Sequence, residues 1–376
     1  MGLSSGCAGV AAPSHHPRKV STSSFYAPTT LVTAQEALDT DALLERAQTH
    51  LEQGRLDAAI AEFRLVAKGA LSSANRLRAL KGWGTALDFK GDLGAALDPY
   101  SRYVAEAPAG SLRDGIQVRV VRILVYRERY TEAGVRAAGI QNKERGPLER
   151  ISILAALALA SIENNSLEEA QLHISRARSI IDAYSFDRVD TPPLDVASLY
   201  FSLGELRRKK AEGIAFDPLP TDFGLALEER CQLILDAQGA YSSAMRSQNA
   251  HWSSMSGVRV SELYHQLHRD LMSMPPPQEV NTLKRQQLFE GALRLRYSIL
   301  LRKSLSVMRS TVTLLDRTPE EDRWGELARA SLVQIQEAQV AEEVAIDALP
   351  YTRTQLQDAL DDLTRRAKKK RKSSKN

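Results

Sequence analysis

Small apolar residues recur along the first half of the chain at a constant interval of 37 residues, marked by Ala59, Ala96, Ala133 and Ala170. Larger residues stand at fixed offsets from each alanine. Three positions before it are Leu56, Leu93, Tyr130 and Leu167, and four positions after it are Phe63, Tyr100, Ala137 and Ile174. A fixed period of this length predicts a stack of structural repeats, each of which buries its apolar face against its neighbours.

Each repeat reads as a pair of helices, most clearly in the second copy. Leu80, Gly84 and Leu87 lie on one face at helical spacing, Gly91 interrupts the pattern, and residues 93–103 resume it. Two helices joined by so short a turn run antiparallel. A small residue at position 84 lets the two helices approach closely, and the aromatic ring of Tyr100 fills the space behind it.

This arrangement resembles the tetratricopeptide repeat. The second copy carries that family's sequence of large, small, aromatic and proline positions in Leu80, Trp83, Gly84, Leu87, Ala96, Tyr100 and Pro108. The third copy departs from it at Gln117 and Ala137, and each unit is three residues longer than the usual 34. The resemblance covers about residues 40–182. It implies an all-α solenoid of antiparallel helix pairs, a superhelix that binds protein partners without a cofactor.

Beyond Asp182 the strict period ends, although helical patterns continue. Five further helices are predicted over about residues 225–246, 252–274, 282–315, 320–348 and 352–363, so the solenoid carries additional long helices at its C-terminal end. The predicted organisation is an N-terminal tether or leader remnant (1–36), four repeats (37–182), degenerate helical repeats (183–318), a helical pair (319–364) and a basic tail (365–376).

Short motifs in the second half resemble the C-terminal halves of large, envelope-associated repeat proteins of myxobacterial type. They are Leu203-Gly204-Glu205-Leu206, Ala240-Tyr241, Trp252, Gly257, Arg259, Ser261-Glu262-Leu263-Tyr264 and the prolines 275–277. The resemblance implies a place in a multiprotein assembly of a bacterial envelope.

The positive charge of the chain is concentrated at its end. The formal net charge is +4, and eight basic residues lie within the last twelve, so the remainder carries −4. The tail comprises Arg365, Arg366, Lys368, Lys369, Lys370, Arg371, Lys372 and Lys375. Such a cluster is typical of a nuclear address, an anionic-membrane or nucleic-acid contact, or a solubilising end. Because the rest of the chain is mildly acidic, the overall charge gives no case for a nucleic-acid-binding domain, and nucleic acid is a disfavoured partner. If the N-terminus is a lipoprotein leader, the tail is expected to contact anionic lipid headgroups, envelope polyanions or a partner protein.

The two cysteines exclude a disulfide framework and any zinc or redox Cys-x-x-Cys spacing. Leu3-Ser4-Ser5-Gly6-Cys7 resembles the end of a bacterial lipoprotein signal, in which Cys7 would be lipidated. Only six residues precede Cys7, fewer than the apolar core of roughly 7 to 15 residues that a signal needs, and Leu3 stands one place too far away. A truncated leader would place the chain in the envelope or periplasm, and a plain N-terminal segment in the cytoplasm.

No catalytic constellation emerges from the sequence. Glu262, His265 and His268 share one helical face, and Glu-x-x-His is the ligand pair of di-iron bundles, but no second copy exists. A phosphate loop and a serine nucleophile elbow are also absent from the sequence. We therefore expect a partly exposed helix face at these histidines, no resident metal and no enzymatic activity.

The first helix of each repeat is the better candidate for a binding surface. In the resembled family its outward positions line a groove, and here they hold Leu44, Gln48, Arg78, Lys81, Thr85, Arg119, Arg122 and Leu159. Four basic residues between apolar ends suit a partner segment with acidic and aliphatic side chains. The asparagines that accompany the basic residues of chaperone-binding repeats are missing. We therefore expect a scaffold or adaptor for one or more proteins, or alternatively a cytoplasmic regulatory module that binds nucleic acid or another polyanion through its tail.

Overall fold

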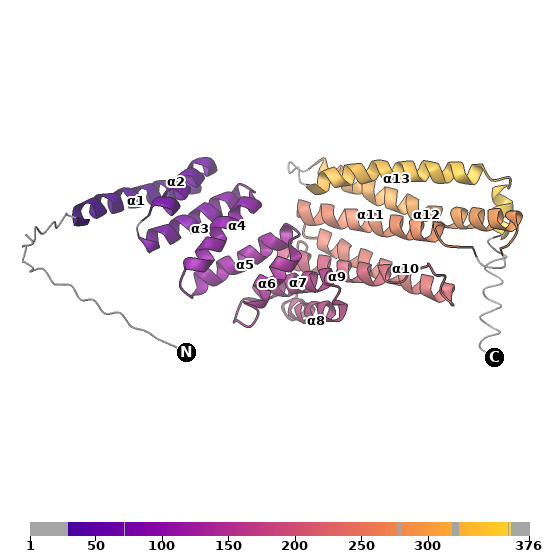
Figure 1. Ribbon diagram of the computed structural model, residues 1–376, viewed down its shortest axis with the longest axis horizontal. Helices are drawn as coiled ribbons and strands as arrows, with labels where there is room; N and C mark the ends of the chain where they lie inside the picture. The colour runs from indigo at the N-terminus through magenta and orange to yellow at the C-terminus, as the bar shows by residue number, and fades with distance from the viewer. Residues whose placement is uncertain (1–28, 71, 277–279, 318–322, 360, 362–376) are drawn as a thin grey trace, which may run out of the picture. The chain divides into compact units, whose positions relative to one another are not determined.

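The computed structural model describes residues 29–70, 72–276, 280–317, 323–359 and 361. All regular elements within these ranges are helices, as Figure 1 shows, and successive helices pack in pairs. The prediction of an all-α solenoid of antiparallel helix pairs with long C-terminal helices is confirmed. By residue contacts the chain forms two compact units, residues 1–82 and 83–376, which are described separately.

The smaller unit contains α1 (Thr29–Glu52), α2 (Leu56–Gly69) and the start of α3 (Ser73–Phe89). Ala47 and Ala59, both fully buried, lie where α1 and α2 pack together. Helix α1 begins at Thr29, earlier than the predicted tether boundary at residue 36. Residues 34–38 (Ala-Gln-Glu-Ala-Leu) are good helix formers and extend the first helix towards the N-terminus.

In the larger unit the repeats continue through six helices. They are α4 (Leu93–Glu106), α5 (Ser111–Tyr126), α6 (Tyr130–Ala138), α7 (Pro147–Glu163), α8 (Leu167–Tyr184) and α9 (Leu194–Glu212). Each helix packs against the next, and α5, α7 and α9 also pack against one another in order. The side chains of Ala96, Ala133 and Ala170 are fully buried between paired helices. The first helices of successive repeats therefore form a continuous wall.

The turn within each repeat has the same backbone geometry in all four copies. Gly54, Gly91, Glu128 and Asn165, each 37 residues from the last, have φ of 72°, 84°, 59° and 59°. The amide of the following residue donates to the carbonyl five positions earlier, for example Asp92 to Leu87 at 3.0 Å. This pattern is a Schellman cap, which satisfies the last carbonyls of the first helix. The second helix then begins two residues later, at positions 56, 93, 130 and 167.

Glycines lie where paired helices come closest. A Cβ atom at Gly84 would stand 2.5 Å from the ring of Tyr100, and one at Gly204 would stand 2.5 Å from the ring of Tyr241. Neither contact could accommodate a side chain, so the aromatic ring packs directly on the backbone of the facing helix. The sequence predicted the first of these contacts, and the structure shows that α9 and α10 repeat it beyond the regular array.

The C-terminal helices are long: α10 (Phe223–Met245), α11 (Ala250–Met272), α12 (Leu283–Leu315) and α13 (Arg323–Asp347). Helices α11, α12 and α13 pack side by side in Figure 1. Ser261 of α11 and Ser304 of α12 each donate to the other's carbonyl at 2.9 Å, and a Cβ at Gly257 would lie 2.2 Å from Thr311 Oγ1. Small residues therefore bring α11 and α12 close together. No helix in the described part of the chain combines the length and hydrophobicity needed to cross a membrane.

Candidate partner groove in the larger unit

A groove of about 910 Å³ runs along the wall formed by α5, α7 and α9. Its lining also includes the turn between α3 and α4 and the first residues of α11 and α13. The residues that the following paragraphs use are Asp88, Lys90, Arg119, Arg122, Arg127, Ser152, Leu194, Asp195 and Arg323. The groove therefore spans several repeats, as expected for a site that holds an extended segment rather than a small molecule.

Arg119 on α5 binds Asp88 on α3 through two hydrogen bonds, one of them Nε to Oδ2 at 2.6 Å. Burial alone would lower the pKa of the Arg119 guanidinium, but the hydrogen bond and the charge of Asp88 raise it. The Tyr100 hydroxyl donates to Asp88 Oδ2 at 3.3 Å. Burial and the neighbouring Asp88 carboxylate raise the pKa of Tyr100 to about 12, although its hydrogen bond with Thr85 acts in the opposite direction. Asp88 thus holds Arg119 in the groove lining and Tyr100 in the core.

Arg122, one helical turn further along α5, makes the equivalent contact with Asp195 at the start of α9. Its Nε donates to Oδ1 at 2.8 Å and its Nη2 donates to Oδ2 at 3.1 Å. Ser152 of α7 bonds both partners, accepting from Arg122 Nε at 3.0 Å and bonding the Asp195 carboxylate. We call the two bidentate pairs, Arg119–Asp88 and Arg122–Asp195, the Arg–Asp ladder. It links the first helices of successive repeats and makes the wall rigid.

Positive charge and apolar surface remain at the edge of the groove. Lys90, Arg127 and Arg323 are exposed, and Leu194 keeps 52% of its surface exposed. The groove lining holds five cationic side chains and two carboxylates, an excess of three positive charges. Both carboxylates already bind the ladder arginines, and Arg323 is paired with Glu128 at 3.4 Å, so the field outside the groove comes chiefly from Lys90 and Arg127. Acidic side chains with an aliphatic neighbour match this surface.

Two of the predicted groove residues are core residues instead. Leu44 and Leu159 are each 1% exposed, so neither can contact a partner. The equivalent positions 37 residues away are not buried, since Lys81 is exposed and Arg122 lines the groove, so the repeat register alone does not decide burial. Helix α7, which carries Leu159, packs against α6, α8 and α9 and buries most of its side chains, and burial of an aliphatic side chain contributes about 1.5 to 3 kcal/mol. This part of the prediction is wrong.

The other predicted residues divide between the two units. In the smaller unit Gln48 donates to Glu52 Oε1 at 2.8 Å, Arg78 donates to Glu45 Oε1 at 2.7 Å, and Lys81 is exposed. Thr85 Oγ1 lies 3.5 Å from the Tyr100 hydroxyl in the larger unit. The structure thus brings Arg119 and Arg122 into one groove, with Thr85 beside it through Tyr100.

Asp195 is the functional residue that the sequence did not reveal. It lies 73 residues from Arg122, and the strict period ends near residue 182, so no spacing relates the two. Its position two residues after Pro193 marks the first turn of a helix, where carboxylates are common because they complement the helix dipole. That signal points to an acidic first turn but does not identify the arginine it meets.

The Glu262, His265 and His268 face is distributed over separate contacts. Glu262 accepts from Arg259 at 2.7 Å, and His268 Nε2 lies 3.7 Å from Glu342 Oε1 of α13. Burial, with Arg269 and His268 nearby, lowers the pKa of His265. No cluster of three or more His, Cys, Asp or Glu placed to hold a metal ion occurs in the described part of the chain.

A buried ionic cluster joins α9, α10 and α11. Glu205 accepts from Tyr241 Oη at 2.6 Å and from Arg208 Nη2 at 2.6 Å, and its Oε1 lies 3.2 Å from Arg259 Nε. The Arg259 guanidinium also lies 5.2 Å from the ring centre of Trp324 on α13. We call Glu205, Arg208, Tyr241 and Arg259 the Glu205 cluster. Glu205, Tyr241 and Arg259 lie in the motifs that suggested the second sequence resemblance, and Arg208 follows one of them by two residues.

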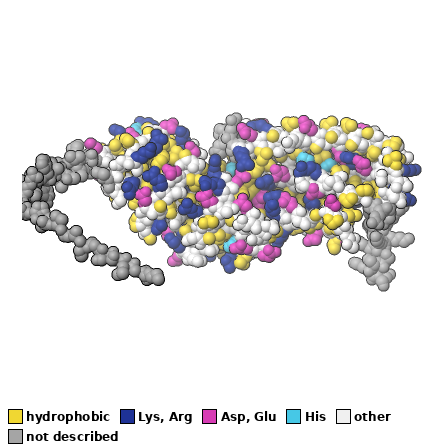
Figure 2. All heavy atoms as spheres, in the orientation of Figure 1, with side chains coloured by type: hydrophobic (Ala, Val, Ile, Leu, Met, Phe, Trp, Pro, Cys, Tyr) yellow, Lys and Arg dark blue, Asp and Glu magenta, His cyan; other side chains and the backbone are white. Residues whose placement is uncertain are grey.

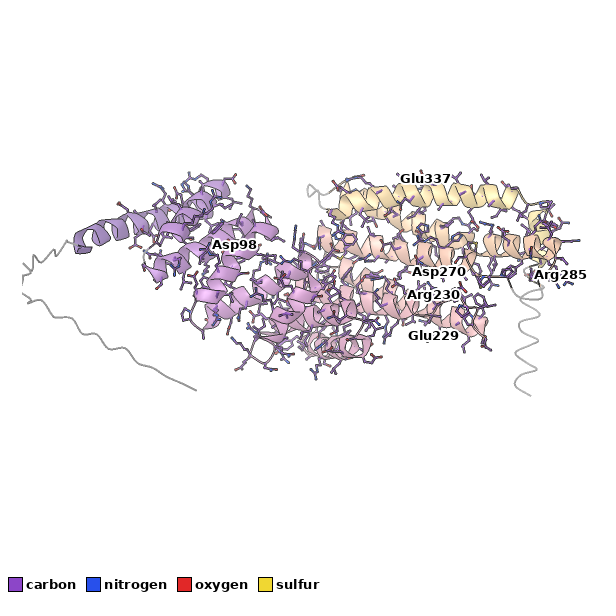
Figure 3. All side chains as sticks on the ribbon, viewed as in Figure 1. Asp98, Glu229, Arg230, Asp270, Arg285 and Glu337 are labelled. Atoms are coloured by element: carbon purple, nitrogen blue, oxygen red, sulfur yellow. The ribbon has the colours of Figure 1, made fainter. Side chains whose placement is uncertain are left out.

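A second ion pair ties α10 to α11. Arg230, 3% exposed, binds Asp270 and donates to the Ile214 carbonyl at 3.1 Å, with its guanidinium 4.9 Å from the Phe216 ring centre. Figure 3 labels Arg230 and Asp270 on these neighbouring helices. These contacts engage both Nη atoms of Arg230, while its buried Nε has no hydrogen-bond partner among the described residues.

Cys7 and the basic tail lie outside the described residues, and their predicted roles stay predictions. Cys231 is half-buried on α10, where burial raises the pKa of its thiol. A raised pKa reduces the thiolate fraction and with it the reactivity.

Fold and groove together define an all-helical repeat protein with a preformed groove. Among solved structures, the chain is similar to a tetratricopeptide repeat protein from Parabacteroides merdae ATCC 43184. The TM-score is 0.40 at 12% sequence identity, over 79% of this chain and 98% of that one. No known family profile matches the chain, and no curated protein matches its sequence.

Proposed function

We propose that this chain is a non-catalytic scaffold or adaptor whose groove in the larger unit binds a segment of a partner protein. The observation that carries the proposal is the groove itself, a channel of about 910 Å³ along consecutive repeat helices. The Arg–Asp ladder fixes its floor before any partner arrives. A preformed groove binds with little ordering cost, so a few contacts suffice for specificity.

The partner segment that fits carries acidic side chains beside an aliphatic one. Leu194 offers an exposed apolar contact next to Asp195. Lys90 and Arg127 are exposed cations at the edge, where Arg323 lies in an ion pair with Glu128 at 3.4 Å. Arg119 and Arg122 contribute less than their charges imply, since each is bound to its own carboxylate.

Site-specific photo-crosslinking in native cells tests the proposal. A benzophenone side chain at position 194 is compared with one at Leu235, which is similarly exposed on α10 at 51%. We expect protein adducts at 194 that are absent at 235 and that disappear in a Lys90→Glu, Arg127→Glu background with unchanged melting temperature. The same adducts from both positions, or adducts that survive the charge reversal, would contradict a groove-specific scaffold.

Placement in a bacterial envelope is a further part of the proposal. It is supported by the Leu3 to Cys7 motif and by the short motifs of the second half. Fractionation of native cells, with a Cys7→Ser variant as comparison, tests it. Equal distribution of both proteins between membrane and soluble fractions would argue against lipidation at Cys7.

A further inference from the structure

A cavity of about 180 Å³ lies between α9, α10 and α11. Helix α10 packs against both neighbours, whereas α9 and α11 contact each other only sparsely, which leaves this space open. One buried water needs about 10 to 15 Å³, and pockets for drug-sized molecules span about 300 to 1,000 Å³. The cavity therefore has room for a small ion or metabolite. Its wall contains the charged or titratable side chains of Arg208, Glu212, Arg230, Glu262, His265 and Arg269.

The two carboxylates in the wall are already paired. Glu212 accepts a hydrogen bond from Arg208, whose Nη2 also donates to Glu205 at 2.6 Å. Glu262 accepts from Arg259 at 2.7 Å. Because each carboxylate is neutralised by its own arginine, the remaining arginines of the wall decide which ligand the cavity attracts.

Two arginines and a histidine in the wall have donors to spare. Arg269 donates to the neutral Gln266 amide and forms no ion pair in the part of the chain that the structure describes. Arg230 is 3% exposed, and its Nε has no acceptor among those residues. The half-buried His265 imidazole forms no hydrogen bond with any of them either. Since buried donors nearly always have a partner, this cavity requires an acceptor that the surrounding helices do not supply.

Positive charge surrounds His265. Burial lowers the pKa of its imidazole, and the charges of Arg269 and His268 lower it further. The other charged groups in the cavity wall are Glu262 on the same helix, Arg208 and Glu212 on α9, and Arg230 on α10. Figure 2 shows histidine side chains (cyan) close to basic side chains (dark blue) on the face formed by the C-terminal helices. A bound anion would raise the pKa of His265, because an adjacent negative charge favours the imidazolium.

We propose that this cavity binds a small oxyanion, either a phosphate or a carboxylate. Arg269 and His265 are its direct ligands, and the Arg230 guanidinium adds positive charge from the wall on α10. Arginine donors match the oxygen atoms of phosphate and carboxylate groups, and such charge-assisted hydrogen bonds are stronger than neutral ones. Ile234 and Leu263 give the wall an apolar part, which suits a short aliphatic stem. The cavity shares no lining residue with the groove, so this site goes beyond the proposed scaffold function.

Calorimetric titration of the full chain with sulfate, inorganic phosphate and succinate, at constant ionic strength, tests the proposal. We expect saturable binding, with phosphate tighter if the natural ligand is a phosphate and succinate tighter if it is a carboxylate. Arg269→Gln should weaken binding by about 10- to 100-fold, because it removes a charge-assisted hydrogen bond. Arg309→Gln on α12 removes the same charge from an exposed position outside the cavity and should leave binding unchanged.

The titration of His265 gives a second readout, followed by proton NMR. Sulfate keeps its charge between about pH 5 and pH 8, the range in which histidines titrate. Sulfate should raise the pKa of His265 and leave that of His173, a buried histidine on α8, unchanged. Affinity for sulfate should therefore increase as the pH falls through the pKa of His265. The variant His265→Gln assigns the resonance and should remove this pH dependence.

Three results would overturn the proposal. The first is the absence of saturable binding of all three anions with a Kd below about 10 mM, which would leave water as the occupant. The second is equal weakening by Arg269→Gln and Arg309→Gln, because binding would then depend on net charge alone. The third is a pKa of His265 that sulfate does not change. Melting of each variant separates loss of binding from loss of folding, and both substituted arginines are exposed.

Discussion

At the scale of single residues, the Glu205 carboxylate illustrates how this fold keeps a charge inside. It is 5% exposed and meets donors on α9, α10 and α11. Desolvation of a carboxylate is costly unless its lone pairs are satisfied and its charge is paired. Here both conditions are met, so the cluster fixes the relative positions of three helices.

Replacing Glu205 by Gln should destabilise the protein by about 3 to 5 kcal/mol, because Arg208 and Arg259 would then be buried next to a neutral amide. Urea unfolding measures the change. Glu262→Gln is the matched control, since Glu262 binds the same Arg259 from a side chain that is 41% exposed. An exposed ion pair contributes less than about 1 kcal/mol. Equal decreases in unfolding free energy for the two variants would show that the buried cluster stabilises the fold no more than the exposed ion pair does.

The same residue should make stability depend on pH. Burial raises the pKa of Glu205, but Arg259, Arg208 and Tyr241 outweigh it, so the pKa in the folded state lies below the ordinary value. The stabilisation is therefore complete above the unfolded-state pKa of about 4.3 and is lost as the pH falls through the folded-state pKa. Between about pH 7 and pH 3 the unfolding free energy of Glu205→Gln should fall less steeply than that of wild type. Parallel curves would contradict this.

Contacts between residues of the repeat could be predicted from the sequence, whereas contacts to residues outside it could not. Gly84 opposite Tyr100 could be predicted, because both positions belong to a pattern that the repeat copies. The bond between Arg122 and Asp195 could not, because their approach depends on how α9 packs against α7. The burial of Leu44 and Leu159 could not be predicted for a related reason: Lys81 and Arg122 hold the same places in neighbouring repeats and are not buried, so burial depends on what packs against each helix.

At the scale of elements, the 37-residue interval is seen in the turns as well as in the helices. The left-handed residue recurs at that interval, and every second helix of a pair begins two residues after it. Helix starts in the repeats were therefore predictable from sequence. The start of α1 at Thr29 was less so, since no earlier repeat fixes it.

Two glycine substitutions should have opposite effects. Gly91 has φ of 84°, so Gly91→Ala forces an L-residue into the left-handed region and should cost about 1 to 2 kcal/mol. Gly115 lies inside α5 with open space where a Cβ would stand, and Gly115→Ala should stabilise by about 1 kcal/mol through helix propensity. Thermal unfolding compares them. Stabilisation by both alanines would show that residue 91 does not adopt the left-handed backbone conformation in solution.

At the scale of the whole molecule, charge is divided between a mildly acidic body and the basic tail of residues 365–376. At about 1 kcal/mol per basic residue near an anionic surface, the tail should bind anionic vesicles at low salt. Removal of residues 365–376 should abolish co-sedimentation with them, and so should raising the salt concentration. Binding that persists without the tail would assign it to the helical units.

The Arg–Asp ladder also gives the association and dissociation rates of the proposed partner a different dependence on salt. Because its charges cancel at short range, a partner approaching the groove senses chiefly the cations at the edge, and those act over about a Debye length. Rising ionic strength should therefore slow association while leaving the dissociation rate nearly constant, since release depends on desolvated contacts at the floor. A floor whose charges are already paired would thus make the lifetime of the proposed complex largely insensitive to salt.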